Sequence, residues 1–275
     1  MTTLDGVRIG FLGAGAMAEA LAGGLRASGV GADSLRLADP DPARRKHVEQ
    51  ALGLATTDDN AALVAGSDLV VIAVKPQVVP TALAALAGAP ELARPLWVSI
   101  AAGVRIARLE AALGAGARIV RAMPNTPALV RSGATAICGN AVASAADLAR
   151  AQALFASVGT CWTAPREALL DAVTGLSGSG PAYVFVFLEA LGDAGVRMGL
   201  PRDAAYQLAF QTVLGAARLA IEDGRHPAAL KDQVTSPGGT TIAGLERLEA
   251  GGLRAAVYDA VAAATRRSQE LARDE

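Results

Sequence analysis

The pattern of hydrophobic and polar residues divides this chain of 275 residues into two parts. In the first part, short apolar runs without alternation are separated by helical patterns. Such runs are typical of strands that are buried on both faces of a parallel sheet. The predicted strands are Val7–Leu12, Leu35–Ala38, Leu69–Val74, Leu96–Ile100 and Arg118–Met123, with shorter ones at Ala134–Cys138 and Thr160–Thr163 that close the sheet. The pattern therefore predicts an α/β domain over residues 1–165.

After about Pro165 no convincing strand pattern remains, and the periodicity is helical. A short helix is expected at Ala168–Thr174, followed by a glycine-rich break at Gly175–Pro181. Longer helices are expected at Pro181–Val196, Pro201–Ile221 and Leu253–Leu271. The first of these is apolar on almost every side, and a unit of about 110 residues is too small to bury such a helix alone. We therefore expect residues 166–275 to form an all-α domain that dimerises with a second copy of the chain.

Composition excludes several classes of function. Hydrophobic residues make up 52% of the chain and charged residues 19%, which argues against disorder, and the net charge of −1 argues against a general nucleic-acid or membrane-surface binder. His47 and His226 are the only histidines, too few for a histidine-based metal cluster or catalytic triad, and we expect no metal site. Cys138 and Cys161 are expected to be small buried residues. The polar N-terminus carries no signal peptide and no apolar run is long enough to span a membrane, so we expect a cytoplasmic protein.

The first predicted strand runs directly into a glycine turn. Gly13, Gly15 and Ala18 form the pattern G-x-G-x-x-A, and a helical pattern follows. In a dinucleotide-binding turn the first glycine permits the bend, the second lets the backbone approach a pyrophosphate, and the small third residue lets helix pack on strand. An Ala/Gly-rich chain also produces this pattern by chance. The position of the pattern directly after the first strand is what supports a dinucleotide-binding turn.

Unusual residues also follow the other predicted strands. Asp39 ends the second strand, where an acid usually bonds the adenosine ribose hydroxyls and disfavours a 2′-phosphate. The basic run Arg44–Lys46 would attract that phosphate or would simply solvate the next helix. Asn60 opens a short helix and is a candidate cap. Lys75 and the small residues Ala101–Gly103 end two buried strands, at the sheet edge where such folds bind ligands.

The loop Val234–Thr241 lies between two helical segments. Pro237 and the pair Gly238-Gly239 make a sharp turn, and Ser236, Thr240 and Thr241 add three hydroxyl groups. Amides and hydroxyls at the start of a helix form a pocket for a small anion such as a carboxylate. The alternative is an ordinary helix joint with Ser/Thr capping.

Six motifs in order along the chain together resemble the pyrroline-5-carboxylate reductase family: GAGAMA, AVKP, SIAAGV, RAMPNTPA, TGLSGSGPAY and HPAALKDQVTSPGGTTIAGL. The resemblance implies an N-terminal Rossmann-type NAD(P)-binding domain over residues 1–165 and a C-terminal helical domain over 166–275 that binds substrate and interlocks with its partner's. It implies an oxidoreductase that makes L-proline in the last step of its biosynthesis, using NADPH. The dinucleotide would be held by Leu12, Gly13, Ala14, Gly15, Ala16, Met17, Asp39, Asn60, Ala73, Val74, Lys75, Pro76, Ala101, Ala102 and Gly103. The substrate would be held by Ser236, Gly239, Thr240 and Thr241, with the Thr241 hydroxyl on the ring nitrogen as the catalytic contact.

Two departures from the family pattern concern the cofactor. Ala16 stands where many relatives carry Asn or Gln, and Asp39 stands where several carry a small hydroxyl residue. The second leaves the choice between NADPH and NADH open, and we expect both to work. The competing functions are a β-hydroxy-acid reductase and a non-enzymatic dinucleotide-binding regulator. The first would place a catalytic lysine on the first helix of the second domain, and residues 166–200 contain no lysine.

Overall fold

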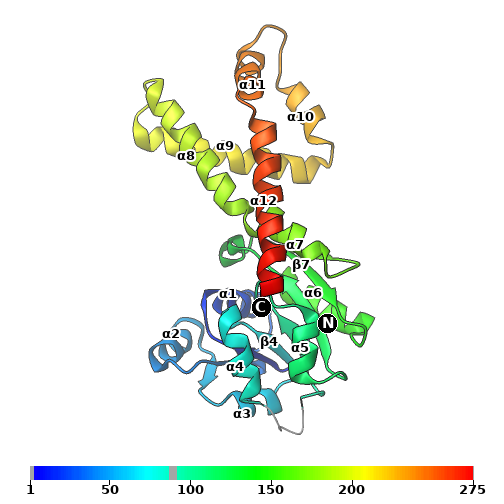
Figure 1. The fold of residues 1–275 in the computed structure, drawn as a ribbon. Coiled ribbons are helices and arrows are strands. Elements are labelled where there is room, and N and C mark those ends of the chain that lie inside the picture. The colour runs from blue at the N-terminus through cyan, green and yellow to red at the C-terminus, as the bar shows by residue number, and fades with distance from the viewer. Residues whose placement is uncertain (1–2, 87–91, 275) are drawn as a thin grey trace. The chain divides into compact units, whose positions relative to one another are not determined.

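An eight-stranded sheet organises the first part of the chain in the computed structural model, which describes residues 3–86 and 92–274 (Figure 1). The strand order is β3-β2-β1-β4-β5-β6-β7-β8, and all neighbours are parallel except β6 and β7. The order 3-2-1-4-5-6 is that of a doubly wound dinucleotide-binding fold. The strands are β1 Ile9–Leu12, β2 Leu35–Ala38, β3 Ala55–Thr57, β4 Leu69–Ile72, β5 Leu96–Ser99, β6 Arg118–Met123, β7 Gly133–Gly139 and β8 Gly159–Thr163.

Helices cover both faces of this sheet, as the unbroken apolar runs predicted. In β4, Leu69 and Val71 pack into one hydrophobic cluster, while Val70 and Ile72 pack into the other. The first cluster is completed by α1 (Ala16–Ala27), α2 (Pro42–Leu52) and α6 (Ala145–Ala156), and the second by α3 (Asn60–Ala65), α4 (Val79–Ala84) and α5 (Ile106–Leu113). Burial on both faces is the reason why these strands are apolar at consecutive positions.

The register places the ends of β1, β4 and β5 in one row, and β6 continues two residues beyond it. Leu12 is paired with Ile72, Ile72 with Ser99, and Ser99 with Arg121. The loops that follow β1, β4, β5 and β6 therefore leave the sheet at one edge, which confirms the expectation drawn from the sequence. The predicted strands were one or two residues too long at one end of β1, β4 and β5 and one residue too short at the ends of β7 and the start of β8, and the three-residue β3 was not predicted.

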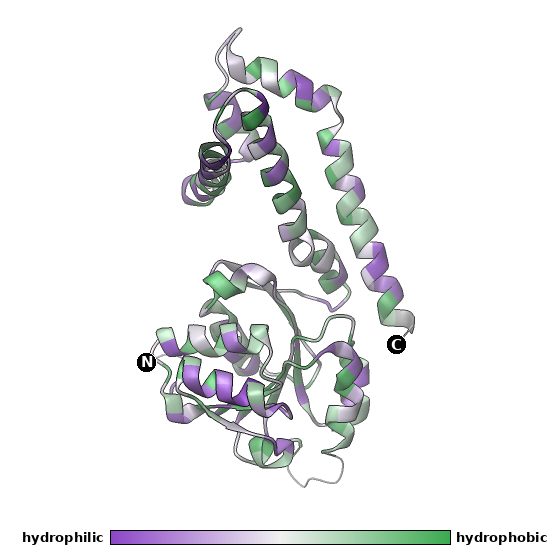
Figure 2. Ribbon diagram, turned by 90° about the vertical axis from the view of Figure 1, so that its left-hand side faces the viewer, coloured by the Kyte–Doolittle hydropathy of each residue, from purple (hydrophilic) through white to green (hydrophobic). Residues whose placement is uncertain are grey.

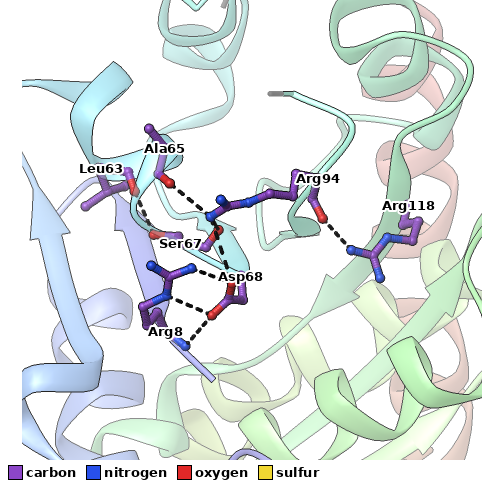
Figure 3. Close-up of polar contacts among 7 residues, drawn as sticks. All are labelled: Arg8, Leu63, Ala65, Ser67, Asp68, Arg94 and Arg118. Carbon is purple, nitrogen blue, oxygen red and sulfur yellow. Dashed lines mark hydrogen bonds and ion pairs between the residues drawn. The ribbon is translucent and has the colours of Figure 1, made fainter. Parts of the chain in front are cut away.

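The opposite edge of the sheet, where the strands begin, carries a charged network (Figure 3). The Arg8 guanidinium donates to both carboxylate oxygens of Asp68, at 3.0 and 2.8 Å, and the Arg8 amide donates to the same group. These hydrogen bonds lower the pKa of Asp68 to about 2, against the opposing effect of partial burial. Arg94 donates to the carbonyls of Ala65 and Ser67, which joins the neighbouring loop to the network.

The second part of the chain is helical, with α7 Leu169–Val173, α8 Gly180–Arg197, α9 Arg202–Asp223, α10 Pro227–Gln233, α11 Thr240–Ala250 and α12 Leu253–Asp274. The predicted glycine-rich break is wrong. Thr174–Gly178 forms one turn of π-helix that continues α7, and the Ser179 amide donates to the Thr174 carbonyl at 2.8 Å. The described residues of the first part also form short 3₁₀ helices at η1 Ala32–Ser34, η2 Pro76–Val78 and η3 Thr126–Val130.

The chain divides into two compact units, one of Met1–Ser179 with Ala263–Glu275 and the other of Gly180–Ala262. The predicted boundary at residue 165 thus lies fifteen residues before the start of the second unit, and the last turns of α12 belong to the first unit. In the second unit, large apolar side chains remain exposed on α8 and α9, among them Phe185 and Val186 at 64% and 67%. Figure 2, coloured by hydropathy, shows hydrophobic and hydrophilic residues interspersed along the helices of this unit. A surface of this kind is typical of a protein–protein contact.

Candidate functional site

The glycine turn after β1 is built by close backbone approach. Gly13 has a φ of +98°, and its amide donates to the Ala38 carbonyl at 2.8 Å. A Cβ on Gly13 would lie 2.9 Å from the backbone of Ala73, so no other residue fits there. A Cβ on Gly15 would meet nothing within 4 Å, and no side chain caps α1, whose cap residue is Gly15. The turn therefore leaves open space in front of uncapped helix amides, which fits a pyrophosphate.

Asp39 holds this turn in place. One oxygen of its carboxylate accepts the Ala14 amide at 3.0 Å, and the other accepts the Asp41 amide at 3.0 Å. Arg45 donates to the Asp39 carbonyl at 2.7 Å, and Arg44 donates to the Ala14 carbonyl. Asp39 thus lies where the adenosine ribose was expected and also has a structural role that the sequence did not reveal.

The two arginines do not merely solvate α2. Besides their bonds to the turn, Arg44 pairs with Glu19 of α1, and Arg45 lies 3.6 Å from Asp58. Partial burial raises the pKa of Glu19, but hydrogen bonds from Arg44 and His47 outweigh it, and the pKa is lowered overall. Glu19 therefore stays ionised and holds Arg44 beside the glycine turn.

Asn60 lies at the same edge of the sheet, because α3 follows the end of β3. It is the first residue of α3, but the cap is Asp59, whose carboxylate accepts the Ala62 amide at 2.9 Å. The candidate capping role of Asn60 is therefore wrong.

The loops after β4 and β5 line a cavity of about 320 Å³. Pro76 and Gln77 line it from the first loop, and Ala102 and Gly103 from the second. Gly103 has a φ of +80° and makes the turn there. The remaining lining comes from Thr174, Ser179, Ala264, Arg267, Ser268 and Leu271. The volume is within the range of small-molecule pockets, and the sequence analysis anticipated only the walls from the two loops.

Lys75 precedes this cavity but is exposed, and it is the cap residue of η2 without making a side-chain capping bond. Ala101 is 3% exposed, and its amide lies 3.4 Å from the Ser99 hydroxyl. Ala73 continues the sheet, because its amide donates to the Leu12 carbonyl at 2.8 Å. The structure thus brings the predicted dinucleotide residues to one edge of one sheet.

The loop Ser236–Thr241 belongs to the second unit. The Gly239 amide donates to the Ser236 carbonyl at 3.1 Å, and Gly238 has a φ of +64°. With Pro237 these features indicate a β-turn of type II. Helix α11 then begins at Thr240, and its cap is Gly239, which has no side chain to make a capping bond. The alternative in which Thr241 only caps the helix is therefore wrong, and the Gly239 amide is engaged within the turn.

Comparison with known proteins identifies the family. Residues 167–271 match the model described as pyrroline-5-carboxylate reductase dimerisation, and residues 8–103 match the one described as NADP oxidoreductase, coenzyme F420-dependent. The pyrroline-5-carboxylate reductase of Synechocystis sp. is 48% identical over 96% of this chain and 98% of its own. The chain belongs to the pyrroline-5-carboxylate reductase family.

Solved structures of pyrroline-5-carboxylate reductases agree with this assignment. The one from Coxiella burnetii is 37% identical, with a TM-score of 0.92 over 96% of this chain and 98% of its own. The Plasmodium falciparum enzyme with NADP bound is 33% identical, with a TM-score of 0.85 over 97% of this chain and 98% of its own. The resemblance drawn from the six motifs and the fold class, a Rossmann-type domain followed by a helical domain, are confirmed.

Two acidic residues that the sequence analysis missed lie in α7 and just before it in this family member. Glu167 accepts the Ile106 amide at 2.8 Å and pairs with the buried Arg121 at 2.8 Å. Asp171 is 2% exposed; it accepts the Ser268 hydroxyl at 2.8 Å and lies 3.4 Å from Arg105. The only sequence signal was the charged Arg121 within a buried strand, which requires a buried partner.

In the described part of the chain the side chains that could bind a metal do not cluster, and burial affects both cysteines. No group of three or more His, Cys, Asp or Glu side chains that would hold a metal lies together in residues 3–86 and 92–274. Burial raises the pKa of Cys161 to about 11 and also raises that of Cys138, so both remain protonated thiols at neutral pH. Within the same residues no helix has the length and apolar character to cross a membrane.

Proposed function

We propose that this chain reduces 1-pyrroline-5-carboxylate to L-proline with a hydride from NADPH, the last step of proline biosynthesis. The observation that carries the proposal is the cavity of about 320 Å³ at the carboxyl ends of β4 and β5. In a doubly wound fold this edge is where the dinucleotide binds. The small residues Ala102 and Gly103 allow a flat ring to lie against the loop. The identity of the substrate is inferred from the names of the relatives.

The residues at the sheet edge fit a dinucleotide. Gly13 makes a cradle that a Cβ would fill, and Gly15 faces open space beside the uncapped start of α1. The amides of Ala16 and Met17 at this helix start are suited to the pyrophosphate. Asp39 with Arg44 would meet the adenosine ribose. Since NADPH carries a 2′-phosphate, Arg44 favours it and Asp39 opposes it, so we propose NADPH as the main donor and NADH as a second one.

The proposed reaction needs little acid–base catalysis by side chains. When bound, the dinucleotide supplies the hydride. The protonated cyclic imine is already electrophilic at carbon, so the protein has to orient the two reactants and exclude water. Correct placement of reacting groups is worth roughly 7–11 kcal/mol of the barrier. The hydroxyls of Thr174 and Ser179 and the guanidinium of Arg267 are among the polar groups that line the cavity, and none of its lining residues in the described part of the chain carries a carboxylate.

Substrate recognition is assigned to the loop Ser236–Thr241. Because the Gly239 amide is bonded to the Ser236 carbonyl, we assign the substrate carboxylate to the amides and hydroxyls of Thr240 and Thr241 and to the Ser236 hydroxyl. Gly239 then leaves the Ser236 hydroxyl in place, since a Cβ added at Gly239 would lie 2.3 Å from that oxygen. The Thr241 hydroxyl is assigned to the ring nitrogen.

A turnover assay tests the proposal directly. Purified protein is mixed with pyrroline-5-carboxylate and NADPH. The decrease in the absorbance of the reduced nicotinamide is followed, and L-proline is identified as the product. The same preparation is offered β-hydroxy acids with NADP⁺. Turnover of the imine alone is the expected result. Turnover of hydroxy acids alone would support the β-hydroxy-acid reductase, and dinucleotide binding without any turnover would support a regulator.

We propose that the chain is a homodimer whose interface covers the exposed apolar surface of α8 and α9, and that dimers associate further. Support comes from the match to the dimerisation model and from exposed side chains such as Phe185 and Val186. Sedimentation at micromolar concentration should show a dimer or a multiple of it, and a stable, fully active monomer would contradict the proposal. We also propose a cytoplasmic location, which cell fractionation tests.

A further inference from the structure

The end of α12 forms one wall of the cavity. Ala264, Arg267, Ser268 and Leu271 line it, and their spacing of three, four and seven residues places them on one face of the helix. This stretch belongs to the same compact unit as the dinucleotide loops, and Figure 1 shows it as the C-terminal end of the chain. The cavity at the end of β4 and β5 is therefore completed by residues about 160 to 190 positions later in the sequence.

A buried hydrogen bond anchors this wall. Ser268 is 7% exposed, and its hydroxyl donates to the Asp171 carboxylate at 2.8 Å. Its neighbours Arg267 and Gln269 are exposed. A carboxylate as buried as that of Asp171 requires donors, because an unpaired charge in such a place is strongly unfavourable. The position of α12 against α7 is thus determined by a specific polar contact as well as by packing.

The same carboxylate also reaches the other walls of the cavity. Arg105, two residues after Gly103, lies 3.4 Å from the second oxygen of Asp171. Thr174 follows Asp171 by three residues and lines the cavity, and its hydroxyl donates to the Leu170 carbonyl at 2.8 Å. Asp171 therefore contacts the loop after β5 and the end of α12 through its side chain, and it belongs to the helical stretch that continues into the π-helical turn.

We infer that Ser268 and Asp171 are positioning residues that hold the end of α12 against the cavity and so control how the nicotinamide half of the dinucleotide is held. The inference rests on the proposed function, because it takes the cavity to receive that half. The adenosine half is held by the glycine turn and Asp39, which have no contact with Ser268 or Asp171 among the hydrogen bonds of the described residues. Loss of the anchor should therefore weaken one half of the dinucleotide and leave the other half unaffected.

The experiment compares two probes in the full-length protein. NADPH occupies both halves of the site, whereas 2′,5′-ADP occupies the adenosine half alone. The variants are Ser268→Ala, which removes the hydroxyl, and Ser268→Thr, which keeps it. Gln269→Ala is the matched control on the adjacent exposed position. Dissociation constants, kcat, the KM for NADPH and the melting temperature are measured on the same preparations.

In Ser268→Ala we expect NADPH to bind about three- to tenfold more weakly, a part of what a hydrogen bond to a carboxylate contributes, and its KM to rise in proportion. The affinity for 2′,5′-ADP should change less than twofold. Ser268→Thr should restore NADPH affinity, and Gln269→Ala should behave as the wild type. Equal weakening of both probes, or unchanged NADPH affinity with a lower melting temperature, would overturn the inference, because the bond would then serve stability alone.

The wild-type protein distinguishes failure of this inference from failure of the proposed function. If it binds NADPH but does not reduce pyrroline-5-carboxylate, the proposed function fails while the comparison of the two probes still decides the inference. If it reduces the imine and the probes respond alike in Ser268→Ala, the inference alone fails. A wild-type protein that binds no dinucleotide would overturn both.

Discussion

Replacement of Asp39 tests how this site chooses between NADPH and NADH. In the structure its carboxylate accepts the amides of Ala14 and Asp41, both at 3.0 Å. Asp39→Ser therefore has two effects: it removes a negative charge beside the expected 2′-phosphate, and it removes hydrogen bonds that hold the glycine turn. The first effect distinguishes the cofactors, and the second is common to both.

The magnitudes follow from these contacts. A hydrogen bond to a charged group contributes about 1.5–3 kcal/mol, so loosening the turn should weaken both cofactors by about tenfold or more. A unit negative charge close to a phosphate opposes it by about 1–4 kcal/mol, depending on solvent exposure. Because the common loss cancels in the ratio, the ratio of kcat/KM for NADPH to that for NADH should rise by at least about fivefold.

The assay measures kcat/KM for both cofactors at saturating pyrroline-5-carboxylate. Asp39→Asn keeps the shape and one acceptor oxygen, so it should raise the ratio with a smaller common loss. Asp33→Ser is the matched control, because it removes one exposed negative charge before the start of β2, at the other end of that strand from Asp39. A common loss with an unchanged ratio would show that Asp39 only supports the turn, and the reasoning about the ribose would be refuted.

Three further predictions concern other parts of the molecule. Thr241→Ala should lower kcat/KM for pyrroline-5-carboxylate by about one to two orders of magnitude, and Thr241→Ser should recover much of it. The melting temperature should stay the same because Gly239 is the cap of α11. A drop in stability with normal turnover would contradict the assignment. Gly15→Val should abolish NADPH binding in a fluorescence titration while circular dichroism stays native, and unchanged affinity would place the dinucleotide elsewhere. Arg8 lowers the pKa of Asp68 from 3.8 to about 2, so the contribution of Asp68 to stability is present above pH 4 and is lost as the pH falls towards 2. The Asp68 side chain is 41% exposed, which reduces that contribution to about 1 kcal/mol. In urea titrations, Asp68→Asn should lower the free energy of unfolding by this amount at pH 7 and by much less at pH 2.5.

The pattern of hydrophobic residues was sufficient to predict most of the sheet. Runs such as Leu69–Ile72 are apolar at every position because each residue faces one of two helical layers, and this local signal needs no knowledge of the fold. Gly13 could be interpreted in the same way, since a tight turn after a buried strand restricts the residue type. The edge strand β3, only three residues long, was missed because so short a segment carries no periodicity.

Other features were decided by the tertiary structure alone. The GLSGSG stretch looked like a helix break because glycines favour turns, yet it continues α7 as a π-helical turn. Asp39 looked like a simple ribose ligand, whereas its carboxylate also braces the Ala14 amide twenty-five positions away. The bond between Asp171 and Ser268 joins residues 97 positions apart. Sequence patterns record which residues share one strand or helix, but they contain no distance between elements, and a buried carboxylate finds its donors only when the chain has folded.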